Sequence, residues 1–243
     1  MYNIKIKGIN NMSYIIQALD SLDYNVTSKN STYYNENGER VPRVTEILSK
    51  MIHNDGLMYW ANSLGFKGLR YKEVLNNAAN MGTIAHNAIE KYLKEKIETN
   101  SNIPFLGFLS WYNIIIEAGL AIKPIYIEHK VACKWFGGTL DALMEIGGKI
   151  YLMDFKTSNH VTYTYFLQLA AYRYMIRLLY NIEVDGVIVL QLDKEEPGFN
   201  EYILTFSNPE HLDFMNKCEE AFLSLVYAFY NVSRVEKDFK NIF

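Results

Sequence analysis

The chain has 243 residues, of which 49% are hydrophobic and 21% charged, and its formal net charge is −3 at pH 7. This length is sufficient for a domain with its own hydrophobic core, and the slight negative charge excludes the broad basic surface of proteins that coat duplex nucleic acid. Two cysteines far apart in the sequence, Cys133 and Cys218, exclude a disulfide framework and an iron–sulfur cluster held by four cysteines of this chain.

The first half of the chain carries mainly helical patterns. A polar stretch at 23–38 predicts a loop and a small hairpin turning at Asn37-Gly38. Thr45 resembles the N-cap of the next helix, and Gly82-Thr83 resembles a helix start. Helical patterns follow over 57–65, 71–82, 83–97 and 102–120.

Beyond Pro124 the pattern changes to β-branched, alternating segments. The predicted order is helices first, then βββαββα, and no linker divides the chain. We expect one domain spanning 1–243, with a mainly helical N-terminal part (1–120) and an α/β core (121–243) in which helices flank a mixed central sheet. Strands are predicted over 125–135, 137–146, 149–157, 184–193 and 201–206, with helices over 162–180 and 208–232.

The Gly147-Gly148 pair predicts a two-residue type I′ hairpin turn, because both turn positions need positive φ. The register of such a turn sets Asp141 opposite Asp154, with Lys156 on the same face and Thr139 across from it. The other face is expected to form a continuous core surface of Leu140, Ala142, Met144, Ile146, Tyr151, Met153 and Phe155.

Two carboxylates directly opposite one another repel by about 4 kcal/mol at an effective dielectric constant near 20. A divalent cation turns this repulsion into binding, because hard cations prefer oxygen ligands, and the Phe155 carbonyl lies between the two key side chains as a further ligand. In the alternative interpretation, Asp154 and Lys156 form a solvated pair and Asp141 is incidental.

Three further residues could either belong to a metal site or have an ordinary structural role. His86, on a helix, would complete a mixed nitrogen and oxygen site, or is simply packed or exposed. Glu90 would orient His86 or pair with Lys94, and we favour the pairing. Glu128 is either a third carboxylate at the metal, with a catalytic role, or a surface strand residue.

Gln168 and Tyr172 lie four residues apart on a predicted helix. They would hold Lys156 and a phosphate, or form a polar stripe on an apolar helix. Arg173 and Arg177 would contact phosphates or be solvated.

Several of these segments, in order, resemble the RecB-family branch of the PD-(D/E)XK nucleases. The likeness covers roughly residues 36–193 and is closest to the group that includes the mitochondrial genome maintenance exonuclease and related phage exonucleases. The matching elements are His86, GGTLDAL with Asp141, MDFKTS with Asp154 and Lys156, and QLAAY with Gln168 and Tyr172.

The resemblance implies a restriction-endonuclease-like core that binds Mg²⁺ or Mn²⁺ through His86, Asp141, Asp154 and the Phe155 carbonyl. Lys156 would orient the attacking water or stabilise negative charge at the phosphorus. Some relatives carry four clustered cysteines for an iron–sulfur cluster, and this chain lacks them.

The implied activity is metal-dependent hydrolysis of DNA from single-stranded ends, with replication or recombination proteins as expected further partners. A structure-specific endonuclease and a catalytically silent nucleic-acid-binding module remain alternatives. Trp60, Tyr71 and Trp111 are candidates for base stacking, although core packing is the favoured role of each. Because no signal peptide or membrane-spanning run is found, we expect no membrane partner and a cytoplasmic location in a bacterium or phage-infected host.

Overall fold

The computed structural model describes residues 27–29, 32–34, 38–53, 55–98 and 102–243. Three short strands, β1 (Thr27–Lys29), β2 (Thr32–Tyr34) and β3 (Arg40–Val41), form a small antiparallel sheet. Asn37 of the predicted hairpin turn lies outside the described residues, but the strands on either side of it do pair, with Tyr33 opposite Val41. The part predicted as mainly helical therefore also contains strands.

Four helices follow, and their boundaries correct two predictions. Thr45 is not an N-cap, since its helix begins one residue earlier, after Arg43, without a side-chain cap. Gly82 and Thr83 lie inside one continuous helix: the Thr83 hydroxyl donates to the Ala79 carbonyl one turn earlier, and an interior glycine costs only about 1 kcal/mol. The helices are α2 (Val44–Met51), α3 (Asp55–Phe66), α4 (Tyr71–Glu95) and α5 (Ile103–Glu117).

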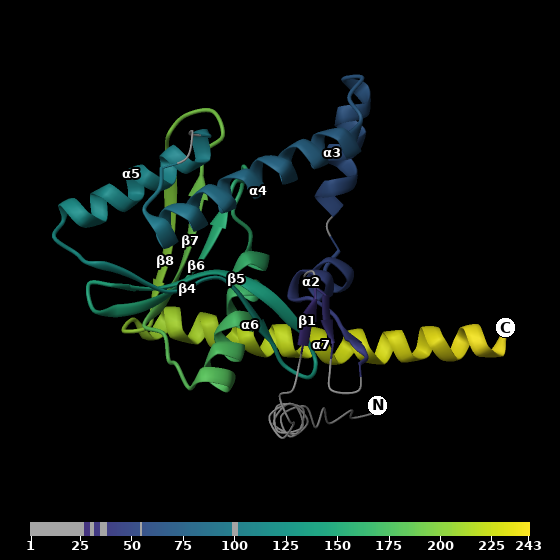
Figure 1. Cartoon of the computed structure of the whole chain (residues 1–243). Helices are drawn as coiled ribbons and strands as arrows, with labels where there is room; N and C mark the ends of the chain where they lie inside the picture. Colours follow the sequence, from purple (N-terminus) through teal and green to yellow (C-terminus); the bar gives the residue numbers. More distant parts are fainter. Residues whose placement is uncertain (1–26, 30–31, 35–37, 54, 99–101) are drawn as a thin grey trace, which may run out of the picture.

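A five-stranded mixed sheet flanked by helices forms the centre of this α/β fold (Figure 1), and the predicted order βββαββα for 121–243 is confirmed. Neighbouring strands are antiparallel except β6 and β7, which run parallel with α6 between them in the chain. The elements are β4 (Ile122–Ala132), β5 (Gly137–Ile146), β6 (Lys149–Lys156), α6 (Tyr163–Tyr180), β7 (Gly186–Leu192), β8 (Phe199–Thr205) and α7 (Pro209–Ile242).

The turn between β5 and β6 has the predicted conformation. Gly147 and Gly148 have φ of +57° and +81°, as a type I′ turn requires. The ladder from this turn ends at Ala142 opposite Met153, whereas β6 continues to pair with β7 to its last residue. The strands β5 and β6 therefore separate next to Asp141, and the predicted ladder pair of Asp141 with Asp154 does not form.

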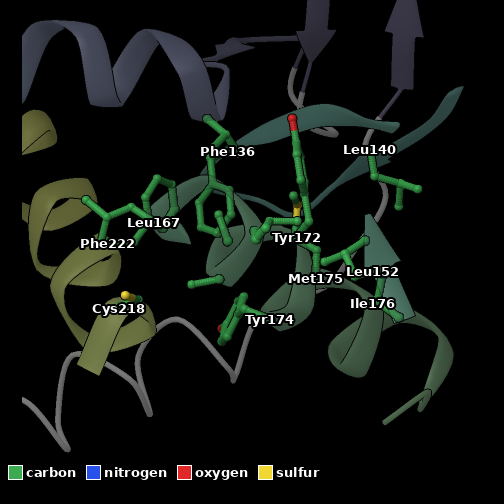
Figure 2. Packing of buried hydrophobic residues seen from close by; sticks show 14 of the residues in the cluster. Phe136, Leu140, Leu152, Leu167, Tyr172, Tyr174, Met175, Ile176, Cys218 and Phe222 are labelled. Atoms are coloured by element: carbon green, nitrogen blue, oxygen red, sulfur yellow. The ribbon is translucent and has the colours of Figure 1, made fainter. Parts of the chain in front are cut away.

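Two apolar clusters cover the two faces of the sheet. Helices α2, α6 and α7 pack on one face (Figure 2), and α4 and α5 pack on the other. Leu140 is predicted on the same face as Ala142, but it lies in the opposite cluster with Leu143. The alternation is interrupted where Glu128 of β4, at φ +47°, leaves the ladder opposite Asp141.

Helices α6 and α7 are joined by buried polar contacts. Arg173 donates to Asn216 at 2.9 Å, and Arg177 pairs with Glu219 at 2.5 Å. Both arginines therefore have partners within the fold, and the expectation that they are simply solvated is wrong. None of the described helices combines the length and apolar character needed to cross a membrane.

Candidate metal centre

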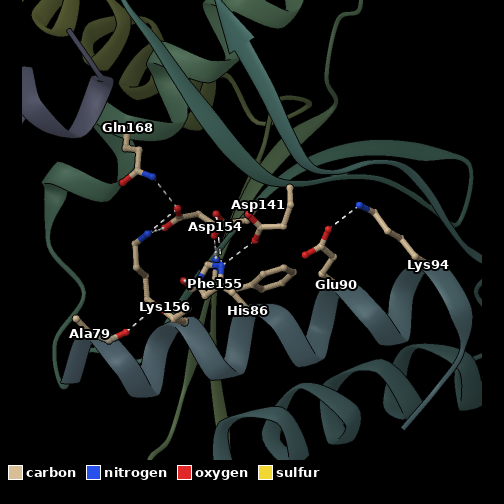
Figure 3. A network of polar contacts seen from close by, with 11 residues as sticks. Ala79, His86, Glu90, Lys94, Asp141, Asp154, Phe155, Lys156 and Gln168 are labelled. Carbon is tan, nitrogen blue, oxygen red and sulfur yellow. Dashed lines mark hydrogen bonds and ion pairs between the residues drawn. The ribbon is translucent and has the colours of Figure 1, made fainter. Parts of the chain in front are cut away.

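The candidate site lies where β5 separates from β6. There the backbone N–H and carbonyl of Phe155 form hydrogen bonds with side chains (Figure 3). The Phe155 N–H donates to Asp141 Oδ2 at 2.7 Å, and its carbonyl accepts from His86 Nε2 at 3.0 Å. One residue of the strand thus draws together a carboxylate from β5 and an imidazole from α4.

Glu128 joins this pair. His86 Nδ1 lies 3.0 Å from Glu128 Oε1 and 3.7 Å from Asp141 Oδ1. Each of these residues, which we call the ligand triad, offers one ligand atom within 4.8 Å of the others. Glu128 therefore lies beside His86, as the interpretation as a third carboxylate of the site requires, and is not an isolated surface residue.

The ligand triad attracts positive charge. Burial by itself lowers the pKa of His86, but the carboxylates of Asp141 and Glu128 outweigh burial and raise this pKa to about 9. His86 is therefore protonated at pH 7, and both ring nitrogens donate hydrogen bonds.

Asp154 and Lys156 form a buried ion pair next to the ligand triad. Lys156 Nζ lies 2.6 Å from each Asp154 oxygen, and Gln168 Nε2 donates to Oδ1 at 3.1 Å. Only 1% of Asp154 is exposed, so the interpretation as a solvated pair is wrong. Burial and the nearby charge of Asp141 raise the pKa of Asp154, and Lys156 lowers it. The net result is a raised pKa of about 6. The pKa of Lys156 is above its usual value, because Asp154 and Asp141 outweigh its burial.

The donor atoms suit a divalent cation. Carboxylate and carbonyl oxygens suit hard cations such as Mg²⁺ and Mn²⁺, whereas imidazole nitrogen suits transition metals, so the set could hold a divalent cation without selecting one. Asp154 is not a member of the ligand triad, and both of its carboxylate oxygens lie 2.6 Å from the Lys156 ammonium.

Two tyrosines pack against β5, the strand that carries Asp141. Tyr33 contacts Gly137, and Tyr172 contacts Gly138. A Cβ on Gly138 would lie 2.7 Å from the Tyr172 hydroxyl, and a Cβ on Gly137 would lie 2.7 Å from the Tyr33 ring. The hydroxyl groups of Tyr33 and Thr139 also form a hydrogen bond, with 3.2 Å between their oxygens. Sequence reasoning missed Tyr33; its signal was the glycine pair, since glycine within a strand marks a close approach.

Two hollows border the Lys156 end of the site. An apolar groove of about 730 Å³ lies between α2, α3 and the start of α6, and both Tyr165 and Gln168 line it. The Tyr165 ring lies 5.0 Å from Lys156 Nζ and Gln168 donates to Asp154, so two residues that line the groove contact the buried ion pair. A polar hollow of about 290 Å³ begins at Thr157, at the carboxyl ends of β6 and β7.

The remaining candidates separate into core and surface. Trp111 is 2% exposed and donates to Glu201 at 2.9 Å, so it belongs to the core as favoured. Tyr71 is exposed. The favoured pairing of Glu90 with Lys94 is confirmed at 2.6 Å, which leaves the orientation of His86 to Glu128 and Phe155.

Comparison with known proteins adds little. No family model matches the chain, and no curated protein matches it. One similar solved structure is described as the crystal structure of SSO0001; the match covers 88% of this chain and 84% of that chain, with 15% identity and a TM-score of 0.36. A likeness this low carries no argument about family or activity. What the elements themselves establish is an α/β fold with a mixed five-stranded sheet between helices.

Proposed function

We propose that this chain is a Mg²⁺- or Mn²⁺-dependent deoxyribonuclease with a restriction-endonuclease-like core, acting at single-stranded DNA ends. The observation that carries the proposal is the convergence of the ligand triad on one strand residue, beside the buried ion pair. Asp141 and Asp154 are both buried, and buried carboxylates are costly unless positive charge lies beside them.

The ligand triad and the Phe155 carbonyl would hold the cation, while the Asp154 carboxylate is paired with Lys156. When bound, the cation supplies charge that polarises a phosphate oxygen and lowers the pKa of water. A mixed imidazole and carboxylate set leaves room for oxygen ligands from a substrate, as catalytic sites require.

Lys156 provides a fixed positive charge for the negative charge that develops at a phosphate. Its ammonium is held by Asp154 on one side and by the Tyr165 ring on the other. Gln168 fixes the Asp154 carboxylate from α6, so the pair needs no reorganisation when a phosphate arrives. The adjoining apolar groove is the proposed path for a single strand.

The decisive experiment compares Lys156→Ala with Lys149→Ala on end-labelled linear DNA, with Mg²⁺ or with EDTA. Both lysines lie on β6, but Lys149 is exposed at the far end, beside the turn. We expect Lys156→Ala to lower the rate by roughly 10²–10³-fold, as the loss of one charge-stabilising donor does in other enzymes. Lys149→Ala should match the unaltered chain. Full activity of Lys156→Ala would refute the proposed site.

Circular single-stranded DNA distinguishes the modes of cutting. An exonuclease leaves the circle intact, whereas cutting of the circle would favour a structure-specific endonuclease on the same core. Binding of DNA without any cation-dependent cleavage would favour the silent module.

A further inference from the structure

The outer end of α7 stands apart from the rest of the described fold. The helix has 34 residues, about 50 Å at 1.5 Å per residue, and its C-terminal part projects beyond the sheet and the other helices (Figure 1). Every side chain from Val232 to Phe243 is exposed relative to the described parts of the chain. Exposed apolar residues on a projecting helix indicate a surface that meets another helix.

The apolar positions on this part of α7 follow a heptad repeat. They are separated by three and four residues in alternation, and the spacing extends back to Ala221. Such a repeat is the pattern of a helix that packs along another helix. The repeat, which we call the α7 stripe, comprises Leu225, Ala228, Val232, Val235, Phe239 and Ile242.

From Val232 onward the α7 stripe is distinct from the face that α7 buries in the core, whereas Leu225, at its inner end, is partly buried against that core. The core face ends with Val226 and Phe229, and its next helical positions are the polar residues Ser233, Glu236 and Lys240. The apolar repeat therefore continues along α7 after the core contact has ended. Its four outer members are 58% to 72% exposed, which the core does not explain.

We propose that the α7 stripe pairs with the α7 stripe of a second copy of this chain, as a parallel, in-register coiled coil. A second copy supplies the same repeat, so the surface is self-complementary about a two-fold axis. Leu225, Val232 and Phe239 take the a positions, and Ala228, Val235 and Ile242 take the d positions.

The flanking charges are compatible with this pairing. Between copies, position g faces position e of the next heptad, which sets Asn231 against Glu236 and Asp238 against Phe243. Neither pair joins like charges.

Only four layers of the α7 stripe lie beyond the core, and interfaces smaller than about 1,200 Å² belong to transient complexes. The dimer is therefore weak and depends on concentration.

Sedimentation velocity over a wide concentration range tests the proposal on the full chain. The unaltered chain should shift from monomer to dimer as its concentration rises. Val235→Glu and Phe239→Glu should each weaken association by roughly tenfold or more, because a charge enters the apolar seam. Lys237→Glu, an f position on the outer side of the same helix, is the matched control and should associate like the unaltered chain.

A disulfide tests the orientation. With oxidised glutathione as the oxidant, Ile242→Cys should form a disulfide-linked dimer, because in-register d positions of parallel helices bring Cβ atoms close together. Lys237→Cys should not, and the native thiols are buried. A chain that stays monomeric at every concentration, or a dimer that survives both glutamate substitutions, would overturn the proposal. So would cross-linking of Lys237→Cys but not of Ile242→Cys.

Discussion

Gly107 of α5 is a position where adding one methyl group should damage the fold, because the methyl group would overlap with backbone. A Cβ there would lie 2.4 Å from the carbonyl oxygen of Gly198, in the β7–β8 connection. That oxygen accepts a hydrogen bond from Asp193 N at 3.0 Å, so it has no free direction in which to move. Ordinary contact begins near 3.4 Å, and α5 must therefore shift by about 1 Å.

The expected loss follows from two opposing contributions. Alanine in place of glycine stabilises a helix interior by about 1 kcal/mol, whereas forced overpacking costs about 1–3 kcal/mol or more. Because the overlap is with backbone, we take the upper end and expect Gly107→Ala to lose about 2 kcal/mol. For a chain of this length, that lowers the Tm by about 4–8 °C.

Urea and thermal unfolding followed by circular dichroism measure this difference. Gly82→Ala is the matched control, because Gly82 also lies within a helix but its Cβ would meet only Thr157 Oγ1 at 3.5 Å. We expect this control to gain up to about 1 kcal/mol. If Gly107→Ala proved as stable as Gly82→Ala, the close approach of α5 to Gly198 would be wrong.

Three further outcomes are expected. In EDTA, the free energy of unfolding in urea should fall by about 3 kcal/mol as the pH rises from about 6 to about 10, because the pKa of His86 is raised to about 9 in the folded chain. The proton on His86 stabilises the fold fully below the unfolded pKa near 6.5, and this stabilisation is lost above the folded pKa. His86→Gln should remove most of this slope, and an unchanged slope would exclude His86 as its source. Gly138→Ala should cost about 1–3 kcal/mol and lower cleavage, because the methyl group displaces Tyr172; unaltered cleavage and stability would contradict this packing. Burial raises the pKa of Cys133 and Cys218 to about 11, so a thiol reagent at pH 8 should modify them only as the chain unfolds in guanidinium, and rapid modification of the native chain would argue against their burial.

Sequence alone predicted what short-range chemistry determines. The Gly147-Gly148 turn fixes positive φ and hence the register of the β5–β6 ladder, which the structure has as far as Ala142 opposite Met153. The order βββαββα along residues 121–243 follows from periodicity in the same way. The prediction of a helix start at Gly82-Thr83 was wrong, because one glycine does not outweigh the helical residues on both sides.

Features that depend on distant segments were not predictable. Leu140 lies on the opposite face from the predicted one because Glu128, twelve residues earlier, leaves the β4–β5 ladder. Tyr33 covers Gly137 across a separation of more than one hundred residues, and no local pattern contains that contact. The parting of β5 from β6 beside Asp141 likewise appears only once the strands are assembled.

The charges at the site indicate what kind of ligand it suits. Glu128, Asp141 and Asp154 carry −3 when ionised and Lys156 carries +1, so the cluster has a charge of −2 when His86 is neutral. The proton on His86 offsets only one of these charges. A dication bound to neutral His86 would balance the cluster fully, whereas a monovalent ion would leave the same excess as the proton does. Because uncompensated buried charge is costly, the proposed divalent cation, bound with neutral His86, would balance the cluster better than the proton on His86 does.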